Sequence, residues 1–116
     1  MNEPRLPSAT DLRAAFLACL RAHEACEAAV ALALRAESGE RVNDRVGALL
    51  DCADVCRTTA RQIRYASPLL RGTAGVAAEL CDRAAEACAA AAHAEAIRRA
   101  AACCRRVAEV PLERVA

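Results

Sequence analysis

The chain has 116 residues, and its 16 Lys and Arg nearly balance its 15 Asp and Glu, giving a formal net charge of +1 at pH 7. This balance gives no electrostatic basis for binding nucleic acid or an anionic membrane, and an aromatic content of 2% leaves no platform on which single-stranded bases could stack. Because alanine, leucine, arginine and glutamate dominate, the composition predicts an all-α fold. We expect residues 1–10 to be a flexible lead and residues 11–116 to form a single domain.

The first helix is predicted to begin after Thr10, a candidate N-cap, with Asp11 in its first turn, where a negative charge suits the helix dipole. It runs to about Arg35 and ends at Ser38-Gly39. Its apolar residues recur every three or four positions, which predicts one buried face and one charged face.

A second helix is predicted over about residues 41–66. It ends at Ser67-Pro68, because the residue before a proline is disfavoured in the α region. Residues 69–75 contain two glycines and a threonine that could cap the next helix, so we interpret this segment as a linker. A third helix is then expected over roughly residues 74–92.

The end of the third helix is ambiguous. Residues 89–96 contain neither glycine nor proline, so the local sequence permits one helix over 74–109 or a hairpin that reverses near His93. A single rod would be roughly 50 Å long at 1.5 Å per residue, whereas the first two helices reach only about 40 Å. We favour the hairpin, with a last helix over about 94–110 that ends at Pro111. Four helices with short connections form an up-down-up-down antiparallel four-helix bundle.

Eight cysteines occur in pairs, one pair on each predicted helix. Cys52 and Cys56 are four residues apart, so both thiols lie on one face of their helix, one turn apart. The other pairs are Cys19/Cys26, Cys81/Cys88 and Cys103/Cys104. No secretory signal is visible, and the cysteines lie in helix-forming sequence instead of the loops of a disulfide scaffold. We therefore expect reduced thiols and a cytoplasmic protein, and the charged residues within 84–102 argue against a membrane span.

The bundle also predicts the heights of the sulfur atoms. Counted from the end of the bundle that holds both turns, one cysteine of each helix lies about a dozen residues along that helix. Since each residue adds about 1.5 Å, these four cysteines are expected at nearly the same height in the bundle. We expect these four to form one layer: Cys26, Cys52, Cys81 and Cys104. Cys56 and His23 are predicted about one turn deeper, and Cys19 one turn deeper still. Cys88 should lie nearer the turns, and His93 at the mouth of the bundle.

Thiolate ligands select soft metals such as Cu(I), zinc and iron–sulfur clusters. Cu(I) accepts two or three sulfur ligands, so thiols one or two turns apart can bridge ions into clusters, whereas one layer of four would equally make a tetrahedral zinc site. The Cys-x-x-Cys motifs of common zinc and iron–sulfur sites are absent.

In the alternative without metal, the cysteines pack as small apolar residues. His23 is either a ligand or a hydrogen-bonded boundary histidine, and His93 either a turn residue or a residue guarding an entrance.

The run DCADVCRTTA over residues 51–60 closely resembles the second helix of the cysteine-rich four-helix-bundle copper storage proteins. The other helices fit the same register, so the resemblance covers roughly residues 14–110. It implies a core lined with thiolates that hold many Cu(I) ions, histidines near one open end, and frequent oligomers. By position it implies these candidate metal ligands: Cys19, Cys26, Cys52, Cys56, Cys81, Cys88 and Cys104, with His23 and His93 as looser matches.

The sulfur lining implied by this resemblance is thinned. The following residues stand where typical members carry cysteine: Ala22, Ala29, Ala85, Ala92, Ile97, Ala100 and Val107. The resemblance therefore implies a small copper load, one specific thiolate site, or a bundle that keeps the fold without its metal.

We expect a non-enzymatic cytoplasmic protein that binds and sequesters Cu(I) through core thiolates, with copper ions as its partner and neither nucleic acid nor a membrane. The alternative is a metal-free structural or protein-interaction bundle, and association into a homo-oligomer is left open. Cys103 is expected on the flank of its helix, so a third hypothesis is a thiol sensor that uses Cys103-Cys104, or a single zinc or cluster site. The sequence contains no nucleophile–base–acid set, phosphate-binding glycine loop or Glu-x-x-His pair of di-iron bundles.

Overall fold

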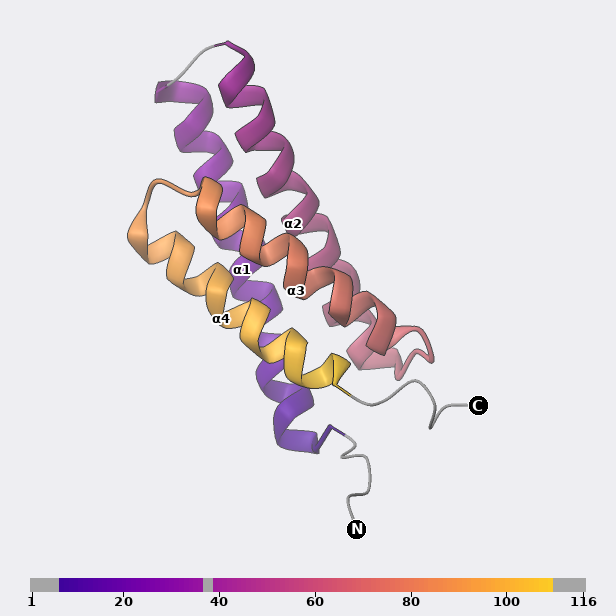
Figure 1. The fold of residues 1–116 in the computed structure, drawn as a ribbon. Coiled ribbons are helices and arrows are strands. Elements are labelled where there is room, and N and C mark those ends of the chain that lie inside the picture. Colours follow the sequence, from indigo (N-terminus) through magenta and orange to yellow (C-terminus); the bar gives the residue numbers. More distant parts are fainter. Residues whose placement is uncertain (1–6, 37–38, 110–116) are drawn as a thin grey trace.

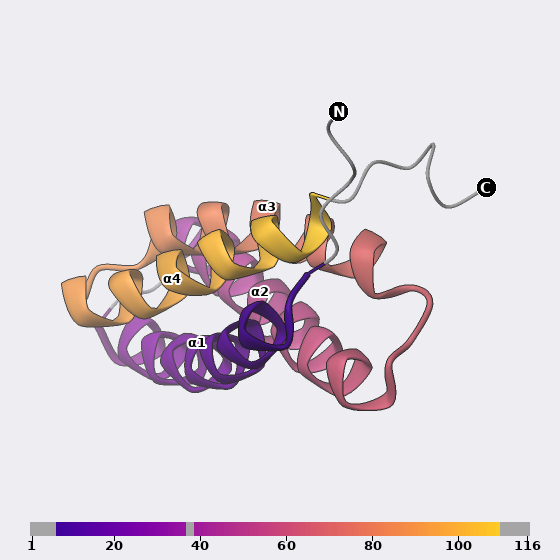
Figure 2. The same cartoon turned by 90° about the horizontal axis from the view of Figure 1, so that it is seen from below.

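The computed structural model describes residues 7–36 and 39–109, and within them it contains four α-helices and no strand. The helices are α1 (Ala9–Ala36), α2 (Glu40–Tyr65), α3 (Leu70–Ala87) and α4 (Ala91–Ala108). Consecutive helices run antiparallel, and each packs against two neighbours in the cycle α1, α2, α3, α4 and back to α1 (Figure 1). Seen from below, α3 and α4 lie as a second layer over α1 and α2 (Figure 2). The predicted all-α, up-down-up-down four-helix bundle is confirmed.

Helix α1 begins two residues earlier than a Thr10 cap would place it. Ser8 and Asp11 form a reciprocal capping box, in which the Asp11 N–H donates to Ser8 Oγ at 3.0 Å and the Ser8 N–H donates to Asp11 Oδ2 at 3.1 Å. Thr10 therefore lies inside the helix, and Ser8 is its cap. Most of the predicted lead lies outside the described residues, as do Ser38 and the predicted end of the last helix at Pro111.

Helix α2 ends close to its predicted boundary, in a left-handed cap formed by Ala66 (φ 51°, ψ 47°). The N–H groups of Ala66 and Ser67 donate to the carbonyls of Ile63 and Gln62, which satisfies the last turn of the helix. Pro68 follows at once and prevents the helix from continuing. Alanine is an unusual residue for this conformation, because its Cβ crowds the following carbonyl in the left-handed region.

We expect Ala66→Gly to stabilise the metal-free protein by about 1 kcal/mol, because glycine adopts the left-handed cap without that crowding. A matched control is Ala31→Gly, an exposed site inside α1 and away from its caps, where the same change should destabilise by about 1 kcal/mol. Urea unfolding followed by circular dichroism measures both. If the two variants shift the midpoint in the same direction, the cap at Ala66 is not strained.

The linker predicted over residues 69–75 is wrong, because α3 already begins at Leu70. Thr73 does not cap the helix: its Oγ1 donates to the Leu69 carbonyl at 3.2 Å from within the first turn. A Cβ placed at Gly75 would lie 3.8 Å from Ala108 Cβ, an ordinary van der Waals contact, so α3 and α4 already pack side by side at this glycine. Tertiary packing thus retains glycines whose helix propensity alone favours a break.

The predicted α3–α4 hairpin is confirmed, but the reversal lies at residues 88–90 and not at His93. Cys88 and Ala90 adopt extended backbone conformations, and the Cys88 N–H donates to the Ala85 carbonyl at 3.2 Å. His93 is part of the first turn of α4. The alanine-rich sequence offers no glycine or proline at this point, so local propensity does not indicate where the chain turns.

The core is made largely of alanine and cysteine, with Leu49, Ile97 and Val107 as the largest fully buried apolar side chains. Such small residues allow the helices to pack closely. The α1–α2 hairpin has helices of 28 and 26 residues, against 18 residues for each helix of the α3–α4 hairpin. Its tip consequently extends beyond the α3–α4 turn (Figure 1). None of the described helices combines the length and hydropathy that a membrane crossing would require.

Candidate metal centre

A cluster of three thiols lies between α2 and α3. Cys52 and Cys56 lie one turn apart on the inner face of α2, and Cys81 projects from α3 beside both of them. The Sγ atom of Cys81 is 3.4 Å from that of Cys52 and 3.5 Å from that of Cys56, and the two α2 sulfurs are 4.0 Å apart. All three side chains are fully buried. In the part of the chain that the structure describes, no other set of three or more His, Cys, Asp or Glu ligand atoms lies within 4.8 Å of one another.

A second pair of thiols joins α1 to α4, where the Sγ atoms of Cys19 and Cys104 are 3.4 Å apart in the buried core. Cys56 also lies near enough to Cys19 to help lower its pKa, which connects this pair to the three-thiol cluster. At the other end of the cluster, Cys52 lies near enough to Cys26 of α1 to raise its pKa. Six buried thiols drawn from all four helices therefore form one continuous column, which we call the thiol column.

The predicted single layer of four cysteines is wrong in its arrangement, because Cys104 contacts Cys19 instead of lying level with Cys26. The prediction placed both turns at the same height. In the structure the α3–α4 turn occurs earlier in the sequence and lies below the longer α1–α2 tip (Figure 1). The cysteines of α4 therefore lie farther from the α1–α2 tip than predicted, and Cys81 lies beside both Cys52 and Cys56.

Two thiols of the column have a lowered pKa because they accept hydrogen bonds from neighbouring thiols. Cys104, and after it Cys56, holds the pKa of Cys19 at about 4. Cys52, and after it Cys56, holds the pKa of Cys81 at about 5. Hydrogen bonds to an ionised group favour that ionised form. Cys19 and Cys81 therefore become thiolates, the form that binds a metal, more readily than an ordinary thiol does.

The donors of these hydrogen bonds have a raised pKa. Donation to Cys19 and to the other neighbouring thiols, together with burial, raises the pKa of Cys56. Donation to Cys19 followed by burial does the same for Cys104, and the bond to Cys52 followed by burial raises the pKa of Cys26. These three thiols keep their protons until a metal displaces them, so metal binding releases protons.

His23 uses both ring nitrogens outside the column. Its Nδ1 lies 2.9 Å from the Ala53 carbonyl, and because a carbonyl only accepts, Nδ1 carries the proton and donates. Its Nε2 lies 3.3 Å from Glu27 Oε1. The structure thus places His23 at the α1–α2 boundary, as a hydrogen-bonded histidine.

The remaining sequence candidates lie at the edges of the bundle. Cys88 is partly exposed in the α3–α4 turn, and its thiol donates to the Ala90 carbonyl at 3.5 Å. His93 is partly buried in the first turn of α4, and its Nδ1 has no hydrogen-bond partner among the described residues. Cys103 lies on the flank of α4 that faces α1, where Arg106 Nη2 donates to its sulfur at 3.5 Å. None of the three hydrogen-bonds to a thiol of the column in the described part of the chain.

Six of the seven thinned positions of the lining lie in the core. Ala22, Ala100, Ile97 and Val107 are fully buried, and Ala29 and Ala85 nearly so, whereas Ala92 is exposed. The thiol column therefore does not continue through these core positions, because apolar side chains occupy them. On α2, the next inward position below Cys56 is the buried Thr59, whose Oγ1 donates to the Val55 carbonyl at 2.7 Å.

This arrangement suits a metal with two or three sulfur ligands. Cys52, Cys56 and Cys81 can surround an ion on three sides, and Cys19 and Cys104 can hold one from two sides. A tetrahedral zinc site needs four ligands at about 2.3 Å from one ion, and the described residues contain no cluster of four. Hard cations are excluded because the lining offers sulfur and no carboxylate.

The fold and the site together define a four-helix bundle with a thiol-lined core. The family model described as "Copper storage protein" matches residues 8–114, and the chain belongs to this family. The crystal structure of the Nmul_A1745 protein from Nitrosospira multiformis superposes with a TM-score of 0.78 and 25% sequence identity, over 87% of this chain and 97% of that one. A comparison with curated proteins returned no match. Copper storage is the function of the family, and Cys52, Cys56 and Cys81 of this chain form a buried group that could hold a metal ion.

Proposed function

We propose that this protein binds Cu(I) in the thiol column and sequesters a small number of ions there. The observation that carries the proposal is the three-thiol cluster of Cys52, Cys56 and Cys81, which is fully buried and continuous with the Cys19/Cys104 pair. Soft thiolates in a dry core favour a monovalent soft ion of low coordination number. Cu(I) meets this description, and zinc would lack a fourth ligand.

The thinned lining limits the capacity. Six thiols form the column, and apolar side chains fill the neighbouring core positions that would otherwise extend it. We therefore propose buffering or sequestration of a few ions instead of bulk storage. We also propose that the protein acts in the cytoplasm, where thiols stay reduced, and that it is not an enzyme.

Anaerobic titration of the reduced protein with Cu(I), in competition with a chromogenic Cu(I) chelator, tests this function. We expect more than one equivalent to be withheld from the chelator, and elemental analysis of the desalted protein to agree. Failure to hold more than one equivalent would reject sequestration. It would favour the metal-free bundle, in which the buried cysteines serve only as small apolar residues.

A further inference from the structure

A hollow of about 570 Å³ lies on the outside of the bundle, between α1 and α4. Its floor includes Ala18 of α1 and Cys103 of α4, and four arginines line it: Arg21, Arg98, Arg99 and Arg106. We call it the arginine groove. Its volume falls within the range of about 300–1,000 Å³ that is typical of small-molecule sites.

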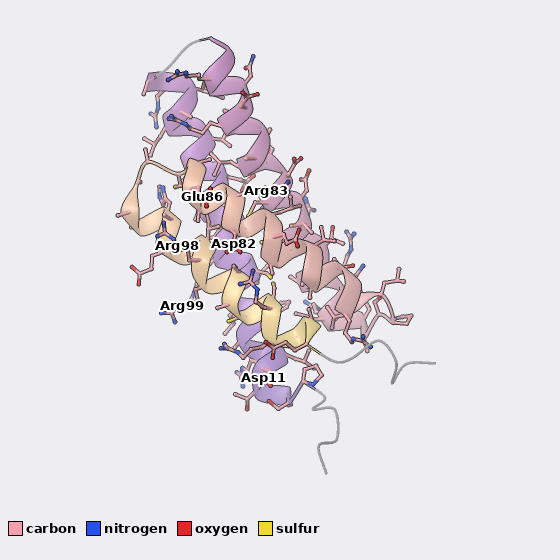
Figure 3. All side chains as sticks on the ribbon, viewed as in Figure 1. Asp11, Asp82, Arg83, Glu86, Arg98 and Arg99 are labelled. Carbon is pink, nitrogen blue, oxygen red and sulfur yellow. The ribbon has the colours of Figure 1, made fainter. Side chains whose placement is uncertain are left out.

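The arginine groove is strongly cationic. Glu95 is the one carboxylate among its lining residues, against four guanidinium groups. Arg21, Arg98 and Arg99 form no ion pair with any residue of the described part of the chain, and Figure 3 shows Arg98 and Arg99 projecting from neighbouring positions on α4. Guanidinium groups bind carboxylates in a planar, bidentate geometry. The groove therefore suits a small ligand that carries carboxylates.

The floor of the groove and the thiol column lie back to back. On α1, Ala18 faces the groove while its neighbour Cys19 faces the column. On α4, Cys103 faces the groove while its neighbour Cys104 lies 3.4 Å from Cys19 in the column. Cys103 is only 6% exposed, yet the hollow reaches it. On each of the two helices, a residue that lines the groove is therefore followed directly in the sequence by a cysteine of the Cys19/Cys104 pair.

We propose that the arginine groove is a lateral loading site, which accepts Cu(I) carried by a small anionic thiol and passes it to Cys19 and Cys104 through Cys103. This proposal rests on the proposed function. The arginines hold the carboxylates of the carrier and bring its copper-bound sulfur to Cys103. Loading therefore takes place through the side of the bundle, between two helices, without passage along the bundle axis.

The transfer is a ligand exchange without oxidation or reduction. The bond between copper and the carrier sulfur breaks as the bond between copper and Cys103 Sγ forms, and the proton of Cys103 goes to the departing carrier thiolate. The bond between copper and Cys103 Sγ then breaks as copper bonds to Cys104 Sγ and to the Cys19 thiolate, and the proton released by Cys104 returns to Cys103. Copper remains Cu(I) throughout, and the carrier leaves as a free thiol.

Stopped-flow transfer of Cu(I) from its glutathione complex to the reduced apoprotein, under nitrogen and followed by thiolate-to-copper absorption, tests the proposal. We expect Arg98→Gln/Arg99→Gln to slow loading by about tenfold at low salt, and the difference from the wild type to vanish at high salt. Arg57→Gln/Arg61→Gln on the exposed face of α2 removes the same charge elsewhere and should load at the wild-type rate. With the Cu(I) complex of mercaptoethanol, which carries no carboxylate, both double variants should match the wild type.

Cys103→Ala should slow loading from the glutathione complex similarly, while the final copper load falls by at most one equivalent. Cys88→Ala, at the α3–α4 turn, should leave the rate unchanged. Wild-type rates in the Arg98/Arg99 and Cys103 variants would overturn the lateral site, as would slowing by Cys88→Ala alone or equal slowing with both carriers. Because the end-point load is read in the same trace, a wild type that holds no copper refutes the proposed function, whereas full loads at equal rates refute only the lateral site.

Discussion

Cys81→Ala is expected to weaken binding of the most tightly held Cu(I) ion by about a hundredfold or more. Structural zinc sites gain roughly 10–16 kcal/mol from four ligands, about 3 kcal/mol per ligand, and we expect a loss of similar size for one thiolate bound to Cu(I). Cys81 contacts both Cys52 and Cys56, and α3 contributes no other thiol to the thiol column. Its removal leaves two sulfurs 4.0 Å apart on one helix, with no third ligand between them.

The matched control is Cys88→Ala, which removes a thiol from the α3–α4 turn, outside the column. It should retain the wild-type affinity. Competition with a chromogenic chelator under nitrogen measures both affinities, and circular dichroism confirms that each variant folds. Equal affinities of the Cys81 and Cys88 variants would show that the three-thiol cluster is not the tight site.

The metal-free protein is expected to be most stable near pH 8 and to lose stability steeply above it. The raised pKa values of Cys26, Cys56 and Cys104 keep these thiols protonated in the folded state, whereas the unfolded chain releases their protons at about pH 8.5. Stability then falls with rising pH by about 1.4 kcal/mol per unit for each such thiol. Below pH 8.5 the lowered pKa values of Cys19 and Cys81 act in the opposite sense, because their contribution is lost as the pH falls towards 4 or 5.

Urea unfolding of the reduced apoprotein between pH 6 and pH 10 measures this dependence. Cys26→Ala removes one of the three protonated thiols and should reduce the alkaline slope by about 1.4 kcal/mol per unit. The copper-loaded protein should lack the steep alkaline loss, because its bound thiolates carry no proton to release. A flat profile of the apoprotein above pH 8.5 would contradict hydrogen bonding between the buried thiols.

The sequence was sufficient where one local feature decides the structure. Pro68 and the Ser38-Gly39 pair fixed the boundaries of the first two helices to within one or two residues. The spacing of Cys52 and Cys56 predicted two thiols on one helical face, and the helical repeat placed Cys104, and not its neighbour Cys103, among the inward thiols. In each case a steric restriction or the helical repeat acts within a few residues, and no tertiary contact overrides it.

The local sequence did not predict the structure where its signals for and against a helix, or for and against a metal ligand, were nearly balanced. Gly72 and Gly75 indicated a linker, yet both lie within α3, which packs against α2 and α4. The alanine-rich stretch around Cys88 contains no glycine or proline, so the reversal is placed by packing and not by a helix-breaking residue. His23 lay at the right spacing for a ligand, but the Ala53 carbonyl and Glu27 on its two sides take up its nitrogens.

The sequence by itself determined that four helices carry thiols on their inner faces, because the helical repeat fixes which side of each helix a cysteine occupies. Only the tertiary structure decided which thiols meet, because the relative height of two hairpins depends on where the chain turns and how closely alanine lets the helices approach. That offset pairs Cys19 with Cys104 and sets Cys81 between Cys52 and Cys56. The same packing leaves Cys103 facing the arginine groove, a juxtaposition of α1 and α4 that no spacing along a single helix encodes.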